Sequence, residues 1–230
     1  MWDGAQWVPN PQRPMVVPPP AAPYESAGPR AGVASILVVS NIAGIFLIAL
    51  DAAVIDGIPN PDDNQSIVIG LLSLIALVVW LGTLIAAAVF YCMWLHRVVR
   101  NMPALGSPDP RMTPRRAVVY CFIPILSLFN PLFSVLDAWR GADASRRWLD
   151  QPARKSIRTP QVIAAWWAAW LIGSYALNIG SRLNGGGAVA LDVIGGVIQI
   201  AAAVLCVMVI REVTARQERK NELIASGQLV

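Results

Sequence analysis

Long runs of apolar residues alternate along this chain with short polar segments. Four of the runs are uninterrupted, at residues 32–52, 67–95, 161–181 and 188–210. A helix needs about 20 apolar residues to cross the hydrocarbon core of a bilayer, which is roughly 30 Å thick, so each run is long enough. The pattern therefore predicts an all-α integral membrane protein with four transmembrane helices in one domain, residues 31–212.

A fifth apolar run is interrupted by proline. Thr113 and Pro114 form a good helix start, because the hydroxyl caps the first turn and proline fits its first position. Pro124 and Pro131 then break the run, since a proline inside a helix removes a hydrogen bond and clashes with the preceding turn. The segment 115–136 either re-enters on one side of the membrane or spans it as a kinked helix.

The distribution of Lys and Arg favours one of these two topologies. Cytoplasmic loops carry an excess of both residues. If the broken segment spans, ten of the 18 basic residues lie outside, whereas only Arg182 does if the segment turns back. The loop 51–66 carries four aspartates and no basic residue, as expected outside. We therefore predict a re-entrant segment at 115–136 and cytoplasmic termini in a multi-pass protein of the cell membrane.

Three cytoplasmic segments accompany the predicted spans. Residues 1–30 contain eight prolines and little aliphatic periodicity, so we expect a disordered proline-rich tail. From Leu132 an apolar stripe accompanies a polar stripe of Asp137, Arg140, Asp143 and Arg147. This pattern predicts a salt-bridged interfacial helix at 132–149, which Gln151 and Pro152 end. Residues 213–230 alternate in charge and predict a charged cytoplasmic tail.

Composition agrees with a membrane protein and offers few groups for catalysis. Hydrophobic residues make up 56% of the 230 positions and charged residues 14%, about half the usual charged share. The basic residues flank apolar runs instead of alternating with aromatic residues, so we expect no nucleic-acid partner. His96 is the only histidine, and Cys92, Cys121 and Cys206 lie inside apolar runs without metal-ligand spacing. We expect no cofactor, no metal and no enzymatic activity.

Several short motifs, taken in order, are similar to those of a known family. They are Trp94-Leu95-His96-Arg97 with Arg100-Asn101, Ala104-Leu105-Gly106, Thr113-Pro114, Ala117-Val118, Phe122-Ile123-Pro124-Ile125 with Leu128, Pro131, Trp139-Arg140, Trp166-Trp167 and Thr214-Ala215-Arg216-Gln217. Over roughly residues 71–217 they resemble the bacterial membrane proteins called domain of unknown function 4328. Arg115 and Arg116 depart from the small residue and tryptophan usual there, and Ser127 from a frequent asparagine. The resemblance implies a membrane architecture and no particular activity.

The basic residues beside the spans predict one functional surface. We expect a non-enzymatic membrane module whose basic cytoplasmic face binds anionic lipid headgroups or a protein partner. The residues expected to bind are Arg97, Arg100, Arg115, Arg116, Arg146 and Arg147, with Arg111, Arg154 and Lys155 on the same face.

Polar residues within the apolar runs are costly in lipid and predict contacts between helices. They are Asn41, Asn130, Ser174, Asn178, Asp192 and Gln199. We expect the last four to face each other across the final hairpin, with Arg182 within reach of Asp192, each contact stabilising by about 1 kcal/mol or less. The alternative function is a small channel or transporter, formed as a homo-oligomer, in which the broken segment and these residues form the pathway.

Overall fold

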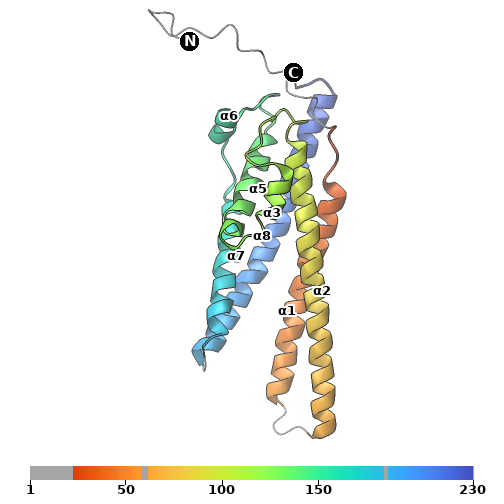
Figure 1. Ribbon diagram of the computed structural model, residues 1–230, viewed down its shortest axis with the longest axis vertical. Helices are drawn as coiled ribbons and strands as arrows, with labels where there is room; N and C mark the ends of the chain where they lie inside the picture. The colour runs from red at the N-terminus through yellow and green to blue at the C-terminus, as the bar shows by residue number, and fades with distance from the viewer. Residues whose placement is uncertain (1–22, 58–61, 184–185, 230) are drawn as a thin grey trace, which may run out of the picture.

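The computed structural model describes residues 23–57, 62–183 and 186–229, with side chains for these residues except 45–57, 63, 186 and 188 (Figure 1). Within these ranges every regular element is a helix. The helices are α1 (Gly28–Gly57), α2 (Asp63–Asn101), α3 (Pro114–Val119), α4 (Pro124–Ser127), α5 (Asn130–Gly141), α6 (Gln151–Ser156), α7 (Gln161–Gly180) and α8 (Gly186–Ala225).

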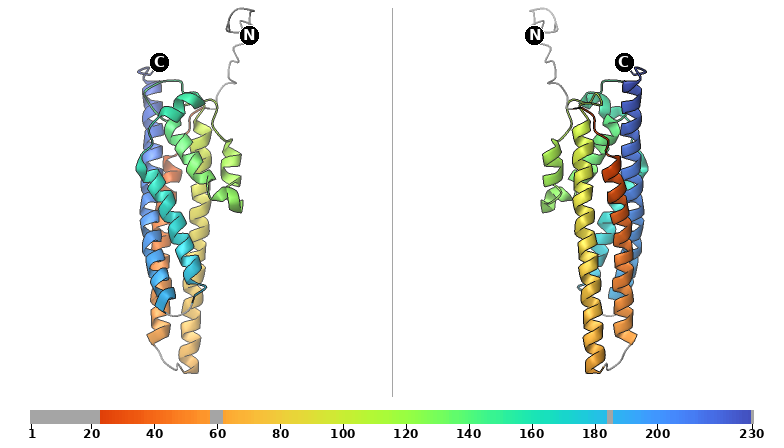
Figure 2. Two further views of the ribbon diagram at one scale, coloured as in Figure 1. Left: turned by 90° about the vertical axis from the view of Figure 1, so that its left-hand side faces the viewer. Right: turned by 90° about the vertical axis from the view of Figure 1, so that its right-hand side faces the viewer.

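Two long helical hairpins form the body of the molecule. Helix α1 pairs with α2 and α7 pairs with α8, while α1 also packs against α8, so the hairpins lie side by side (Figures 1 and 2). The end of α1, the start of α2, the end of α7 and the start of α8 lie at one end of the bundle (Figure 1). The start of α1, the ends of α2 and α8, and α6 lie at the other. We call this second end, formed by residues 23–30, 94–113, 137–160 and 211–225, the polar end.

Three helices are long and apolar enough to cross a membrane within the part of the chain that the structure describes. They lie at Asn64–Asn101, Gln161–Gly180 and Val189–Ala225, and correspond to three of the four predicted spans to within one residue at Gly180 and Val189. The most apolar window of α2 has no buried residue, so much of its surface faces the surroundings of the protein. The fourth predicted span, 32–52, falls in α1, where the side chains beyond Gly44 lie outside the described residues.

The two longest helices extend beyond a bilayer core. Helix α2 has 39 residues and α8 has 40. At 1.5 Å per residue each is about 60 Å long, roughly twice the thickness of the hydrocarbon core. The apolar part of α8 ends at Ile210, and the helix continues unbroken through charged residues to Ala225. The predicted boundary at 212 is therefore a change of composition within one helix.

The proline-containing segment 115–136 reverses direction. Thr113 caps α3, as predicted, and accepts a hydrogen bond from the Arg116 backbone. The chain turns through the short α4 and returns along α5, so that Asn130 Nδ2 donates a 3.0 Å hydrogen bond to the Ala117 carbonyl. Trp167 Nε1 on α7 donates to the Leu128 carbonyl at 3.0 Å. These contacts hold the reversed segment against itself and against α7.

The predicted interfacial helix 132–149 is shorter than expected and pairs differently. Helix α5 begins at Asn130, because Pro131 is tolerated in a first turn, and it ends at Gly141. The aspartates of the predicted stripe pair outside it, Asp137 with Arg154 and Asp143 with Arg216. Gln151 and Pro152 do not end a helix but begin α6, where Asp150 accepts a 2.9 Å hydrogen bond from the Ala153 backbone.

The described part of the predicted tail is packed against the bundle. Disorder is expected through Arg30, whereas α1 begins at Gly28 and Ala27 is fully buried. Glu25 forms an ion pair with Arg97, and its backbone N–H donates to Asn101 Oδ1 at 3.3 Å. Residues 1–22 of the predicted tail lie outside the described residues.

Candidate functional site

Buried polar side chains are concentrated at the polar end. Seven of them expose less than a tenth of their surface: Arg97, Asn101, Ser107, Arg154, Thr214, Gln217 and Lys220. A buried polar group without a partner destabilises a protein by roughly 1–3 kcal/mol. The hydrogen bonds of these seven side chains therefore decide whether this end is a stable scaffold.

Residues that carry the family resemblance meet at this end although they are far apart in the sequence. Trp94 Nε1 on α2 donates a 3.0 Å hydrogen bond to Thr214 Oγ1 on α8. One turn further along both helices, Gln217 Nε2 donates to the Val98 carbonyl at 2.8 Å, and Asn101 Nδ2 donates to Gln217 Oε1 at 3.4 Å. The two hairpins are thus joined by polar contacts above the apolar core.

Helix α5 is fixed to α8 by a second motif pair. Arg216 Nε donates to the Trp139 carbonyl at 3.2 Å, and the guanidinium carbon lies 4.5 Å from the centroid of the Trp139 ring. The same guanidinium forms an ion pair with Asp143. Burial opposes ionisation of Asp143, but hydrogen bonds from Ser145 and the charges of Arg216 and Lys220 outweigh it and hold the pKa of this carboxyl below its ordinary value.

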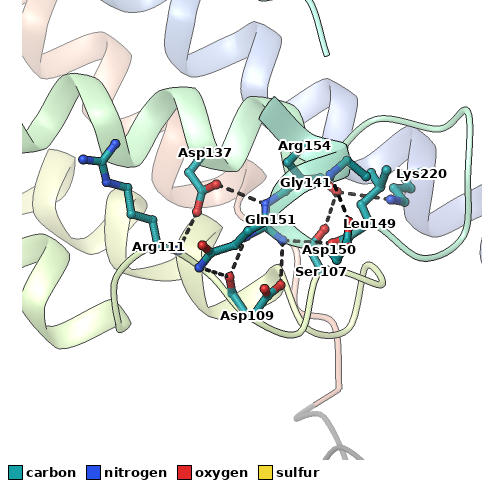
Figure 3. A network of polar contacts seen from close by, with 11 residues as sticks. Ser107, Asp109, Arg111, Asp137, Gly141, Leu149, Asp150, Gln151, Arg154 and Lys220 are labelled. Carbon is teal, nitrogen blue, oxygen red and sulfur yellow. Dashed lines mark hydrogen bonds and ion pairs between the residues drawn. The ribbon is translucent and has the colours of Figure 1, made fainter. Parts of the chain in front are cut away.

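Arg154 joins three segments of the polar end (Figure 3). Its side chain is 1% exposed. Nε donates to Asp137 on α5 at 3.1 Å, and Nη1 donates to the Asp109 carboxylate at 3.0 Å and to the Leu149 carbonyl at 2.9 Å. Nη2 donates to the Asp109 carbonyl. A buried guanidinium is stable only with partners of this number and geometry.

A glycine allows two of the segments that hold Arg154 to approach each other closely. Gly106 adopts φ +83°, a conformation that residues with a Cβ rarely adopt. Its carbonyl accepts a 2.8 Å hydrogen bond from the Leu149 backbone, and a Cβ here would lie 1.8 Å from the Arg147 carbonyl oxygen. The loop 102–113 and the segment 142–150 are therefore in direct backbone contact.

Lys220 is a buried ammonium group at the polar end. Its side chain is fully buried, and Nζ donates a 3.1 Å hydrogen bond to the Gly141 carbonyl (Figure 3). The same carbonyl accepts from Ser107 at 3.2 Å. Among the described residues no carboxylate forms an ion pair with Lys220, because the nearby Asp143 pairs with Arg216.

The six arginines predicted to bind lipid divide into two groups. Arg97 is 8% exposed, and both it and Arg100 pair with Glu25, so these two belong to the packed polar end. Arg147 is half-buried, with its guanidinium carbon 4.7 Å from the Trp148 ring centroid. Arg115, Arg116 and Arg146 are exposed and form no ion pair among the described residues, whereas Arg100 is exposed but paired. Arg154, expected on the same face, is a buried structural residue instead.

The polar residues of the spans are only partly brought together. Gln199 Nε2 on α8 donates to Ser174 Oγ on α7 at 2.7 Å. Asn178 is exposed, and Asp192 is exposed beside Gly180, where a Cβ would lie 2.2 Å from the carboxylate. The ion pairs among the described residues do not include one between Arg182 and Asp192. Asn41 Nδ2 is buried without a hydrogen-bond partner in the described part of the chain.

Sequence reasoning missed Asp109 and did not assign Lys220 or Gln217 to the site. Asp109 lies in a proline-rich loop, where an acidic residue is unremarkable, and its partner Arg154 is 45 residues away. Gln217 had a signal, since it closes the last motif of the resemblance. The described residues contain no group of three or more His, Cys, Asp or Glu side chains placed to hold a metal ion.

Comparison with known proteins gives one match. A family model described as "Domain of unknown function (DUF4328)" matches residues 63–215, about two thirds of the chain. No curated protein and no solved structure matches. The matched range contains α2 to α7 and most of α8, and therefore most of the polar end.

Proposed function

This chain belongs to the DUF4328 family, and we propose that it acts as a multi-pass membrane module, not an enzyme, in which a small set of exposed arginines at and beside the polar end binds anionic lipid headgroups. In this proposal four helices span the bilayer, the segment 115–136 re-enters it, and both termini are cytoplasmic. The lipid surface is formed by Arg115 and Arg116 at the start of α3, and we include the exposed Arg146 in it.

The exposed tip of the reversed segment supports re-entry. Phe122 and Ile125 are 70% and 75% exposed, and Phe129 is also exposed. Apolar side chains gathered at a turn in this way are stable in acyl chains and costly in water. We therefore place the tip in the inner leaflet.

The backbone at the breaks is suited to that environment. Lipid offers no hydrogen bonds, so each N–H there needs a partner within the protein. The N–H groups of Cys121, Phe122 and Phe129 donate to Val118, Val119 and Leu126 carbonyls at 3.0 to 3.1 Å, and Ser127 donates to Ile123 at 2.7 Å. The two short breaks therefore leave these donors satisfied.

The lipid proposal rests on the exposure of two neighbouring arginines near the reversed segment's tip. Arg115 and Arg116 are exposed six to ten residues before Phe122 and Ile125 of the apolar tip, without an ion pair among the described residues. With the tip among acyl chains, both guanidinium groups are at headgroup level, where each basic residue adds on the order of 1 kcal/mol of attraction to anionic lipid.

The test is the thermal stability of the purified protein in neutral detergent with added phosphatidylglycerol or phosphatidylcholine. We expect phosphatidylglycerol to raise the unfolding temperature more, and 0.5 M salt to remove the difference. The double variant R115Q/R116Q should lose most of this difference. The matched control R158Q/R219Q removes the same charge from two other exposed positions and should retain it. Equal stabilisation by both lipids in the unmodified protein would refute the proposal.

The second candidate function is a channel or transporter, and one observation favours it. Polar atoms of Asn41 and Asn130 are buried without partners among the described residues, as is usual along a wet path and unusual in a dry helix interface. Ion flux into liposomes that disappears in Asn130→Ala or Asp192→Asn would replace the lipid-binding proposal with this one.

A further inference from the structure

A cavity of about 320 Å³ lies between α5, α6 and the loop that precedes α3. Its walls carry four cationic side chains, Arg111, Arg140, Arg154 and Lys155, and one carboxylate, Asp137. None of the exposed arginines assigned above to the lipid surface lines it. The volume is in the range of small-ligand sites.

Both oxygens of the carboxylate in this cavity already have hydrogen-bond partners. Asp137 Oδ1 accepts from Arg154 Nε at 3.1 Å, and Oδ2 accepts from the Arg111 backbone N–H at 2.7 Å (Figure 3). Arg154 is in turn fixed by Asp109. The pairing of Arg154 therefore leaves the cavity with a surplus of positive charge from the other three cations.

Those three cations lack anionic partners among the described residues. Arg140 Nε is buried and has no hydrogen-bond partner there, which is a cost that a bound acceptor removes. The Arg111 guanidinium lies 4.3 Å from the centroid of the Phe133 ring, which holds it at the cavity. Lys155 is exposed at its rim. Two guanidinium forks and an ammonium around one space are the chemistry that binds phosphate.

An apolar stripe leads from the tip of the reversed segment to this cavity. Phe133, Leu136 and Arg140 follow one another at steps of three and four, so they lie on one face of α5, and Phe129 is the residue that precedes the helix. Phe129 is exposed at the tip, while Phe133 and Leu136 line the cavity. The surface is thus apolar at one end and cationic at the other, which suits a lipid with acyl chains at one end and a phosphate at the other.

We propose that this cavity binds a phosphate group through Arg111, Arg140 and Lys155. Among anionic lipids it selects those whose headgroup is a phosphate monoester. Binding of a lipid, as opposed to a soluble phosphate, rests on the function proposed above. A phosphate monoester carries up to two negative charges and three terminal oxygens, which can accept hydrogen bonds from several of these cationic side chains. A phosphate diester carries one negative charge and two terminal oxygens. The same chemistry is found in soluble phosphates, so the source of the phosphate is decided by experiment.

The first experiment measures affinity of the full-length protein in detergent for four probes. These are phosphatidic acid, phosphatidylglycerol, glycerol 3-phosphate and inorganic phosphate. We expect phosphatidic acid to bind at least about tenfold more tightly than phosphatidylglycerol, and R140Q/K155Q to remove that preference, because the variant loses charged hydrogen bonds to the terminal phosphate oxygens. The control R158Q/R219Q keeps it. Tight binding of glycerol 3-phosphate that is also lost in R140Q/K155Q supports the site with a soluble source.

A second measurement needs no variant and so does not depend on folding of the mutants. Lys155 and Lys220 are the only lysines of the chain, one exposed and one fully buried. Amine acetylation followed by mass spectrometry should modify Lys155, and a saturating phosphate probe should slow that reaction severalfold without affecting Lys220.

The outcomes separate this inference from the lipid surface. If R115Q/R116Q loses the stabilisation by phosphatidylglycerol but keeps the preference for phosphatidic acid, the exposed arginines and the cavity are two separate sites, as proposed. Phosphate probes that leave the acetylation rate of Lys155 unchanged, or a phosphate preference that survives in folded R140Q/K155Q, would overturn the inference whether or not the exposed surface binds lipid.

Discussion

Trp94 and Thr214 are 120 residues apart in the sequence, yet Trp94 Nε1 donates a 3.0 Å hydrogen bond to Thr214 Oγ1. The Thr214 hydroxyl in turn donates to the Ile210 carbonyl at 2.7 Å, so one side chain is both acceptor and donor in a buried position. This pair fixes the end of α2 to α8 where the apolar core meets the polar end.

Replacing Thr214 by valine keeps its shape and removes the acceptor. The buried Trp94 N–H is then left without a partner, and we expect a loss of about 1–3 kcal/mol in the free energy of unfolding. Trp94→Phe should destabilise through lost packing and the same bond, and the double variant should cost less than the sum of the two. Thermal unfolding in detergent measures all three, and strict additivity would show that the bond contributes nothing.

Arg154 should be the most sensitive charged position of the chain. Arg154→Gln leaves Asp137 partly buried without its cation, and we expect a loss of roughly 3–5 kcal/mol in stability. Arg154→Lys should recover little of it, because a single ammonium cannot reach Asp109, Asp137 and Leu149 together. The control Arg158→Gln, at an exposed position nearby in sequence, should change stability by less than about 0.5 kcal/mol.

The role of Arg154 also shows where prediction from sequence stops. The apolar runs predicted α2, α7 and α8, because the length of a membrane-crossing helix is a local property of the sequence. The prolines predicted breaks in the fifth apolar run, and α4 and α5 begin at Pro124 and Asn130, because the effect of proline on a helix is also local. The partners of Arg154 are 17 and 45 residues away, and only the folded chain brings them together.

A similar reason explains the error at the predicted interfacial helix. Spacing at three and four residues suggested that Asp143 would pair within its own helix, but α5 ends at Gly141. Asp143 instead pairs with Arg216, 73 residues further along. Periodicity reports which residues share a face when a helix exists, and it does not report where the helix ends.

The contact inside the last hairpin gives a graded prediction. Ser174→Ala removes the 2.7 Å hydrogen bond from Gln199, and we expect a loss of about 0.6 kcal/mol and at most about 1.7, as for other interhelical bonds in membranes. Asn178→Ala, one turn further along α7 at an exposed position, should leave the unfolding temperature unchanged. A larger effect at position 178 than at 174 would mean that the register between α7 and α8 is different.

The lowered pKa of Asp143 predicts a dependence on acid pH. A carboxyl whose pKa is lower in the folded state binds fewer protons there than in the unfolded state. Its contribution to stability is complete above the ordinary carboxyl pKa of about 4 and is lost as pH falls through the lower folded value. Unfolding temperatures measured from pH 6 to pH 3 should therefore fall less steeply for Asp143→Asn than for the unmodified protein, and parallel curves would contradict this account.

The most direct test of the central claim, that the chain turns back between α3 and α5, is the side of the membrane on which residue 145 lies. Ser145 and Asn64 are exposed, and each can be replaced by cysteine after Cys92, Cys121 and Cys206 are changed to alanine. A membrane-impermeant maleimide added to intact cells should label Asn64→Cys, and should label Ser145→Cys only after the cells are opened. Labelling of position 145 in intact cells would mean that the broken segment spans the membrane, and the proposed cytoplasmic site would then lie outside.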